Sequence, residues 1–227
     1  MTYCLFLTAH NPHPGFQLKM TDIAEQLATL PGLTQLLFHQ PLDLPDADPF
    51  IAAEATPNCV IQLYFSTIDQ IEAALHIEGK LGAFVQASNL AGYQWEQQVM
   101  LVRRFGDSPP PPTLPRSEEQ VTYLVHYSGH VDDEADWIER YLHQHPPLLA
   151  KLPNVRSVEV YTRLDYCSQL PVSRSNALQR NKVVFDSAQG LRAALASPQR
   201  EALREDYLSL PRFVGESPHY PMHTCEY

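Results

Sequence analysis

Short segments of this sequence alternate apolar and polar residues with a period of two, which is typical of half-buried β-strands. Residues 121–128 place Val, Tyr, Val and Tyr on one face and Thr, Leu, His and Ser on the other. After the acidic residues 132–136, which suit the positive end of a helix dipole, apolar residues recur at helical spacing from Trp137. The second half therefore predicts the order β-α-β-β-α-β. Its strands are expected at 121–128, 155–163, 182–185 and 219–226, and its helices near 132–149, 188–196 and 199–208.

The first half predicts the same order of elements. Its strands are expected at 3–8, 33–40, 59–65 and 95–104, and its helices at 21–29 and 67–75. Three short matches between the halves occur in the same order at offsets of 120, 122 and 120 residues. They pair Thr2–Leu5 with Thr122–Val125, Leu30–Leu33 with Leu152–Val155, and Phe65–Leu75 with Phe185–Leu195. The chain is therefore interpreted as a tandem duplication.

A proline-rich segment separates the two halves. Residues 106–119 read GDSPPPPTLPRSEE, and five prolines in this stretch favour extended backbone over helix or sheet. We therefore predict a first unit over residues 1–105, a linker over 106–119 and a second unit over 120–227.

A β-α-β-β-α-β unit forms a four-stranded antiparallel sheet with its helices on one face. Because burying apolar surface contributes ~25 cal/mol per Å², the open sheets of the two units are expected to pack on each other around a cavity. The helix-facing set is expected to be apolar: Tyr3, Leu5, Leu7, Leu36, Phe38, Tyr123, Val125, Val158 and Val160. The cavity-facing set is mixed: Phe6, Gln35, His39, His126, Glu159, Tyr161 and Arg163.

Composition and charge narrow the functional classes. Of the 227 residues, 44% are hydrophobic and 19% charged, so the chain can fill a core and is not disordered over most of its length. A net charge of −10 without a basic block excludes binding to nucleic-acid phosphates or to an anionic membrane. No signal-peptide pattern or membrane span is evident, and the four cysteines stand far apart, so we expect free thiols in a cytoplasmic protein.

Several short motifs in the second half carry a family resemblance. They are His145-Pro146-Pro147-Leu148, Leu152-Pro153-Asn154-Val155, Phe185-Asp186-Ser187 and Ala194-Leu195-Ala196-Ser197-Pro198. With these motifs, residues 120–227 resemble an EthD-type domain of the dimeric α/β-barrel superfamily. The resemblance implies an α+β fold of two ferredoxin-like units packed sheet to sheet within one chain. In the first half, Ile23 stands at the position that His145 occupies in the second. The first half therefore resembles the family only in its order of strands and helices.

The superfamily contains cofactor-free dehydratases, decarboxylases, isomerases, cyclases and monooxygenases as well as haem-using members. The resemblance therefore implies a fold and does not select a reaction.

His145 is the first catalytic candidate, because an imidazole exchanges protons near neutral pH. Pro146 and Pro147 remove two backbone donors, so we expect a break in the helix that exposes His145. The alternative interpretation is a structural histidine that caps the freed carbonyl groups or anchors the helix to the sheet.

Five further residues complete the candidate site. His126 and Tyr161 are expected to transfer protons, and Arg163 to hold a phenolate or carboxylate. Asp206 and Tyr207 are candidate substrate-binding residues. For each of them a structural role, such as an inter-sheet polar network or a helix cap, stays open.

No cofactor or metal is expected, but haem use stays open, with His145, His126, His219 or His223 as conceivable ligands. His219 and His223 lie about 13 Å apart on a strand, and the sequence carries no nucleotide-binding or serine-hydrolase motif. We predict a small-molecule enzyme that catalyses dehydration, isomerisation, cyclisation or decarboxylation of an apolar or aromatic compound in the inter-sheet pocket. The alternative is a non-catalytic ligand-binding or stress-related protein. Since the second unit replaces a partner subunit, a monomer is viable, and a homodimer stays open.

Overall fold

The computed structural model describes residues 1–10, 19–44, 48, 56–87, 92–106 and 120–227. The first half contains β1 (Thr2–His10), α1 (Met20–Leu27), β2 (Leu33–Pro41), β3 (Cys59–Phe65), α2 (Ile68–Ala74), α3 (Lys80–Val85) and β4 (Gln94–Phe105). The second half contains β5 (Gln120–Val131), α4 (Glu134–Leu149), β6 (Val155–Arg163), β7 (Ser173–Arg174), β8 (Gln179–Phe185), α5 (Ala188–Leu195), α6 (Pro198–Ser209), β9 (Phe213–Glu216) and β10 (His219–Glu226).

The predicted elements are present in the predicted order. The capping residues explain several helix starts: Thr67 forms a capping box with Gln70, and the side chain of Asp133 accepts a hydrogen bond from the Asp136 amide. The short elements α3, β7 and β9 were not predicted, because six, two and four residues are too few to show a hydrophobic period.

Eight of the strands close into a barrel in the order β1-β3-β2-β10-β5-β8-β6-β4, and β4 pairs back with β1. All neighbours in this ring are antiparallel. Each half supplies four adjacent strands, and the halves join at two seams, β2 with β10 and β4 with β6. The predicted α+β fold of two ferredoxin-like units packed through their sheets is confirmed.

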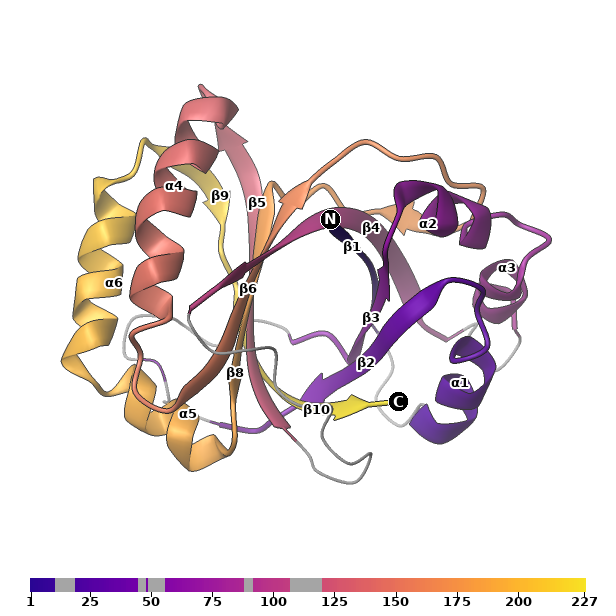
Figure 1. Ribbon diagram of the computed structural model, residues 1–227, viewed down its shortest axis with the longest axis horizontal. Coiled ribbons are helices and arrows are strands. Elements are labelled where there is room, and N and C mark those ends of the chain that lie inside the picture. The colour runs from indigo at the N-terminus through magenta and orange to yellow at the C-terminus, as the bar shows by residue number, and fades with distance from the viewer. Residues whose placement is uncertain (11–18, 45–47, 49–55, 88–91, 107–119) are drawn as a thin grey trace.

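Helices cover the barrel on two sides. Figure 1 shows α1, α2 and α3 outside the strands of the first half and α4, α5 and α6 outside those of the second. The helix-facing prediction is confirmed, since all nine residues lie in or against the two apolar cores beneath these helices. A third apolar cluster, which includes Phe6, Met100, Tyr161 and Met222, fills the middle of the barrel.

The expected break at Pro146 and Pro147 is wrong. Helix α4 continues through both prolines to Leu149, and the Ala150 amide donates to the Pro146 carbonyl at 2.9 Å. Burial of Trp137, Tyr141, His145 and Leu149, at intervals of four residues, stabilises this end of the helix against the sheet. His145 is therefore buried rather than exposed.

Some predictions about organisation stay untested. Apart from Gly106, the proposed linker (106–119) lies outside the described residues, and the unit boundaries remain a prediction. In the described part of the chain, no helix has both the length and the apolar character needed to cross a membrane. The cytoplasmic location also remains a prediction.

Candidate active site

The structure distributes the six predicted site residues over three places. His145, Asp206 and Tyr207 come together on the outer, helix-covered face of the second half. Tyr161 and His126 lie inside the barrel, toward opposite ends. Arg163 lies near the barrel rim and donates hydrogen bonds to Asn176 and Glu134.

The outer site is a groove of about 250 Å³ between α4, α6 and the strands β5 and β10. We call it the His145 groove. Its walls are mostly aromatic, imidazole and apolar groups with two arginines, contributed by Tyr127, His145, Arg200, Leu203, Arg204, Tyr207, Leu208, Ser217 and His219. His145 reaches the groove because it continues the buried face of α4 one turn beyond Tyr141. The two rings pack at 4.7 Å between centroids, tilted by 36°.

A histidine–aspartate dyad stands in this groove. The Nδ1 atom of His145 lies 2.8 Å from Oδ2 of Asp206, and their side chains are only 8% and 10% exposed. An ionised carboxylate accepts hydrogen bonds and cannot donate, so Nδ1 carries the proton in this contact. The hydrogen bond thereby orients the ring and leaves Nε2 with its lone pair as a proton acceptor.

Three other polar groups of the groove, His219, Arg200 and Tyr207, are neutral or compensated within the fold. Nδ1 of His219 lies 2.6 Å from the Ser217 carbonyl, and burial lowers the pKa of His219 to about 4, so this ring is uncharged at pH 7. The guanidinium of Arg200 donates to Asp48 at 2.9 Å. Burial raises the pKa of the Tyr207 phenol, which keeps its proton for donation. The Nε2 atom of His145 is thus placed to accept a proton beside a phenolic donor.

The prediction that His145 acts in the inter-sheet pocket is wrong. Its neighbour Tyr127 belongs to the apolar core between the helices and the sheet, so the sheet itself separates His145 from the barrel interior. The error has a simple cause. The alternation of apolar and polar residues assigned the correct buried faces to the strands. It could not show that a groove forms between the helices and the outer face of the sheet.

Tyr161 lies in a buried polar cluster within the barrel. Its hydroxyl lies 2.7 Å from that of Tyr64 and donates to Glu159 at 2.5 Å. The Lys182 ammonium donates to the same carboxylate at 2.8 Å and to the Tyr64 hydroxyl at 2.7 Å, while Arg104 donates to Glu159 at 2.9 Å. Two residues of this cluster, Tyr64 and Arg104, come from the first half, so the cluster links the halves.

Electrostatics fix the ionisation of this cluster. Burial alone would raise the pKa of Glu159, but the charge and hydrogen bond of Lys182, helped by Tyr161 and Arg104, lower it to about 2. Burial, together with the Glu159 charge, raises the pKa of Tyr161 well above its ordinary value. A chamber of about 610 Å³, here called the Glu159 end of the barrel, opens beside the cluster.

Two buried cations of the barrel were not predicted as site residues. Arg180 and Lys182 are two residues apart on β8 and therefore point to the same face. The signal that could have identified them is the presence of two charged residues at alternate positions of one buried strand. Arg180 lines the opposite end of the barrel together with His126, Thr8 and Phe6, and we call this the Arg180 end.

Arg163 does not line a pocket with His126 and Tyr161, as was expected. Its guanidinium donates to both carboxylate oxygens of Glu134, at the start of α4, and to Asn176. This ion pair already satisfies the group that was predicted to hold a ligand anion.

No three His, Cys, Asp or Glu side chains of the described residues cluster in a way that could hold a metal ion. His39, another inward-facing histidine, contacts Thr224 at 2.8 Å and Gln62 at 2.7 Å. Its role in the structure is therefore a hydrogen bond across the β2–β10 seam.

Comparison with known proteins identifies the fold. No family model and no curated protein matches the sequence. An anthrone oxidase-like protein matches with a TM-score of 0.67 and 13% identity, over 99% of this chain and 92% of its own. A "Putative monooxygenase" from Fusobacterium nucleatum matches with a TM-score of 0.56 and 7% identity, over 99% and 93%.

An EthD family protein from Bacillus halodurans also matches, with a TM-score of 0.35 and 19% identity, over 44% of this chain and 96% of its own. The two likenesses with the higher TM-scores span nearly the whole chain and show that it has the dimeric α/β-barrel fold.

Proposed function

We propose that this protein is a small-molecule enzyme that transfers protons through the His145–Asp206 dyad. The observation that carries the proposal is the 2.8 Å hydrogen bond between the two side chains at the wall of the His145 groove. A buried carboxylate that orients an imidazole is a recurrent arrangement of general bases, because it fixes the tautomer and stabilises the imidazolium that forms.

An aromatic carbonyl compound suits the groove. Its volume of about 250 Å³ is near the lower end of the range for small-molecule pockets, and Tyr127, Tyr207 and two imidazoles offer faces on which a planar ring can stack. The structural neighbour described as anthrone oxidase-like supports the same class, because anthrone is a tricyclic ketone with an acidic CH₂ group between aromatic rings.

The proposed step is enolisation. Nε2 of His145 accepts a proton from the carbon next to the carbonyl-conjugated rings, the C–H electron pair moves into the π system, and the negative charge collects on the carbonyl oxygen. Tyr207, which keeps its proton, donates a hydrogen bond to that oxygen. The imidazolium beside Asp206 then returns the proton to carbon or to oxygen, so no oxidant or reductant is consumed.

Hydrogen–deuterium exchange tests the step directly. Anthrone in D₂O loses its CH₂ signal in ¹H NMR as enolisation proceeds, and the protein is expected to accelerate this loss. His145→Gln should reduce the acceleration by about 10²–10⁴-fold. Asp206→Asn should reduce it less and shift its pH profile, because the imidazole keeps its place but loses the carboxylate.

A matched control uses the exposed histidine two residues earlier on the same helix. His143→Gln should leave the exchange rate unchanged, since His143 is exposed, does not line the groove, and places its Nδ1 atom 2.7 Å from the Glu139 carbonyl. Exchange that persists in a folded His145→Gln variant, checked by circular dichroism, would refute the role of His145. Anthrone that binds the unsubstituted protein without exchange would favour the alternative of a ligand-binding protein.

A further inference from the structure

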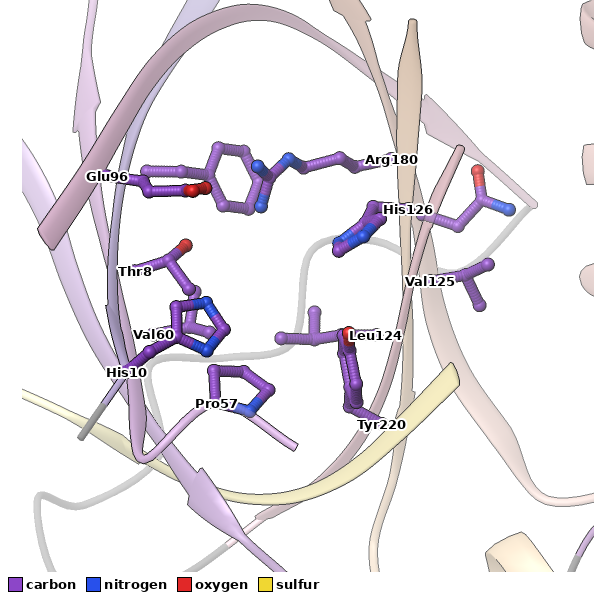
Figure 2. A pocket seen from close by; sticks show the side chains of 12 residues that line it. Thr8, His10, Pro57, Val60, Glu96, Leu124, Val125, His126, Arg180 and Tyr220 are labelled. Carbon is purple, nitrogen blue, oxygen red and sulfur yellow. The ribbon is translucent and has the colours of Figure 1, made fainter. Parts of the chain in front are cut away.

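The Arg180 end of the barrel is a small chamber enclosed by side chains from six strands and by Pro57. Its volume is about 30 Å³, enough for a group the size of a carboxylate or for a few water molecules. Figure 2 shows Arg180 and His126 reaching into this space from one wall, with Thr8 and His10 on the wall opposite.

Arg180 is a buried cation whose hydrogen-bond partners are all neutral. The residue is 7% exposed. Its Nε donates to the Gln98 amide oxygen at 3.2 Å, its Nη2 donates to the Ser175 hydroxyl at 3.0 Å, and its guanidinium lies 4.7 Å from the centroid of the Phe6 ring. Among the described residues, Arg180 forms no ion pair, and three of its five N–H donors, both on Nη1 included, have no protein acceptor.

Lys182, the next inward-facing residue of the same strand, is a buried cation with a counter-ion. Lys182 lies 2.8 Å from the Glu159 carboxylate and donates to Tyr64. Its charge is therefore neutralised within the fold. Leaving a buried charge without a counter-ion is strongly unfavourable. Since no described residue forms an ion pair with Arg180, its guanidinium is suited to bind an anion.

The surroundings of Arg180 favour such an anion. Burial, followed by the charge of Arg180, lowers the pKa of His126 to about 3, which leaves a neutral imidazole beside the guanidinium at pH 7. Thr8 adds a hydroxyl group to the wall. Glu96 is the one acidic residue among the described residues that line the chamber, and it comes from the wall opposite Arg180 in Figure 2. It forms no ion pair with Arg180, but burial lowers the pKa of Arg180 and the charge of Glu96 partly offsets this effect.

We propose that Arg180 anchors a second ligand site inside the barrel, and that the ligand is a small carboxylate. The planar guanidinium presents parallel N–H groups that match the two oxygens of a carboxylate. The volume limits the bound group to about that size. This site lies on the opposite face of the sheet from the His145 groove and is independent of the proposed proton transfer.

Isothermal titration calorimetry with sodium acetate tests the proposal, with acetamide as the uncharged molecule of the same shape. The unsubstituted protein should bind acetate and not acetamide. Arg180→Gln should weaken acetate binding at least about tenfold. Arg174→Gln is the matched control, because Arg174 is an exposed arginine outside the chamber, and this variant should bind acetate like the unsubstituted protein.

Two further variants keep the test decisive. Arg180→Lys retains the charge but not the fork, so its affinity should fall between those of the unsubstituted protein and Arg180→Gln. It also replaces Arg180→Gln if that variant does not fold. Glu96→Gln removes a nearby negative charge and should bind acetate at least as tightly. Equal acetate affinity in Arg180→Gln, weaker binding in Glu96→Gln, or no binding by the folded unsubstituted protein would each overturn the proposal.

Discussion

The two halves of the molecule share a scaffold but differ in what their helices bury. In the first half, Ile23 of α1 packs into a continuous apolar core. At the corresponding position of the second half, 122 residues later, α4 buries His145 against Asp206. The acidic partner comes from α6, which has 12 residues, whereas the last helix of the first-half layer, α3, has six.

This difference shows where the fold has room for chemistry. A hydrocarbon at the position of His145 satisfies the packing, as Ile23 does, so a buried imidazole–carboxylate pair is not required to hold the helix on the sheet. Buried polar pairs often give no more stability than apolar residues of similar size. The contrast with Ile23 is consistent with the functional role that we propose for the dyad, and the following predictions test it.

The largest effect is expected when the second half is made like the first. His145→Ile combined with Asp206→Leu should lower the proton-transfer rate by about 10²–10⁴-fold while leaving the free energy of unfolding unchanged or higher. Exchange of the anthrone CH₂ protons and urea denaturation measure the two quantities. A variant that loses several kcal/mol of stability would instead assign the dyad a structural role.

The next effect concerns the polar cluster that joins the halves. Glu159→Gln leaves the buried Lys182 ammonium without its counter-ion and should lower the free energy of unfolding by about 3–5 kcal/mol. Adding Lys182→Met should recover most of this loss, since no uncompensated charge then remains. Arg104→Gln is the control: its side chain is 50% exposed, so the same denaturation experiment should show a change below about 1 kcal/mol.

A smaller effect is expected in the first-half core. Ile23→Ala should destabilise the protein by about 2–4 kcal/mol, because it leaves a cavity beneath α1. Glu25→Ala, on the exposed face of the same helix, should change stability by less than about 0.5 kcal/mol. Thermal and urea denaturation would show the difference, and equal effects of the two substitutions would mean that α1 does not pack as described.

The smallest effect is a pH dependence at the β2–β10 seam. Burial, followed by the Lys182 charge, lowers the pKa of His39 from its ordinary 6.5 to about 3. Below pH 6.5 the unfolded chain therefore binds a proton that the folded protein rejects, and stability falls as the pH falls from 6.5 toward 3. His39→Gln should reduce this slope by up to about 1.4 kcal/mol per pH unit, as measured by urea denaturation at pH 7, 6 and 5. An unchanged slope would contradict the prediction.

Local patterns predicted the scaffold well. The strand limits Cys59–Phe65 and Val155–Arg163 and the nine helix-facing residues agree with the structure, because the period of two depends only on the side chains within a strand. The internal offset near 120 residues also predicted that two sheets face each other. The strand limits and the helix-facing positions are encoded by neighbours in the chain and need no knowledge of the whole fold.

The candidate site was only partly predictable. His145 was identified from a sequence motif, and Asp206 and Tyr207 were named as candidate substrate-binding residues. The three do meet, but their meeting place outside the barrel depends on how α4 and α6 pack. Two further features depend on which side chains the closed barrel brings together: the ion pair of Arg163 with Glu134, and the burial of Arg180 without an ion pair among the described residues. Periodicity and the order of the elements follow from the sequence alone. Which charges are compensated depends on the tertiary structure, because Coulomb interactions and burial depend on distances in space that spacing along the chain does not specify.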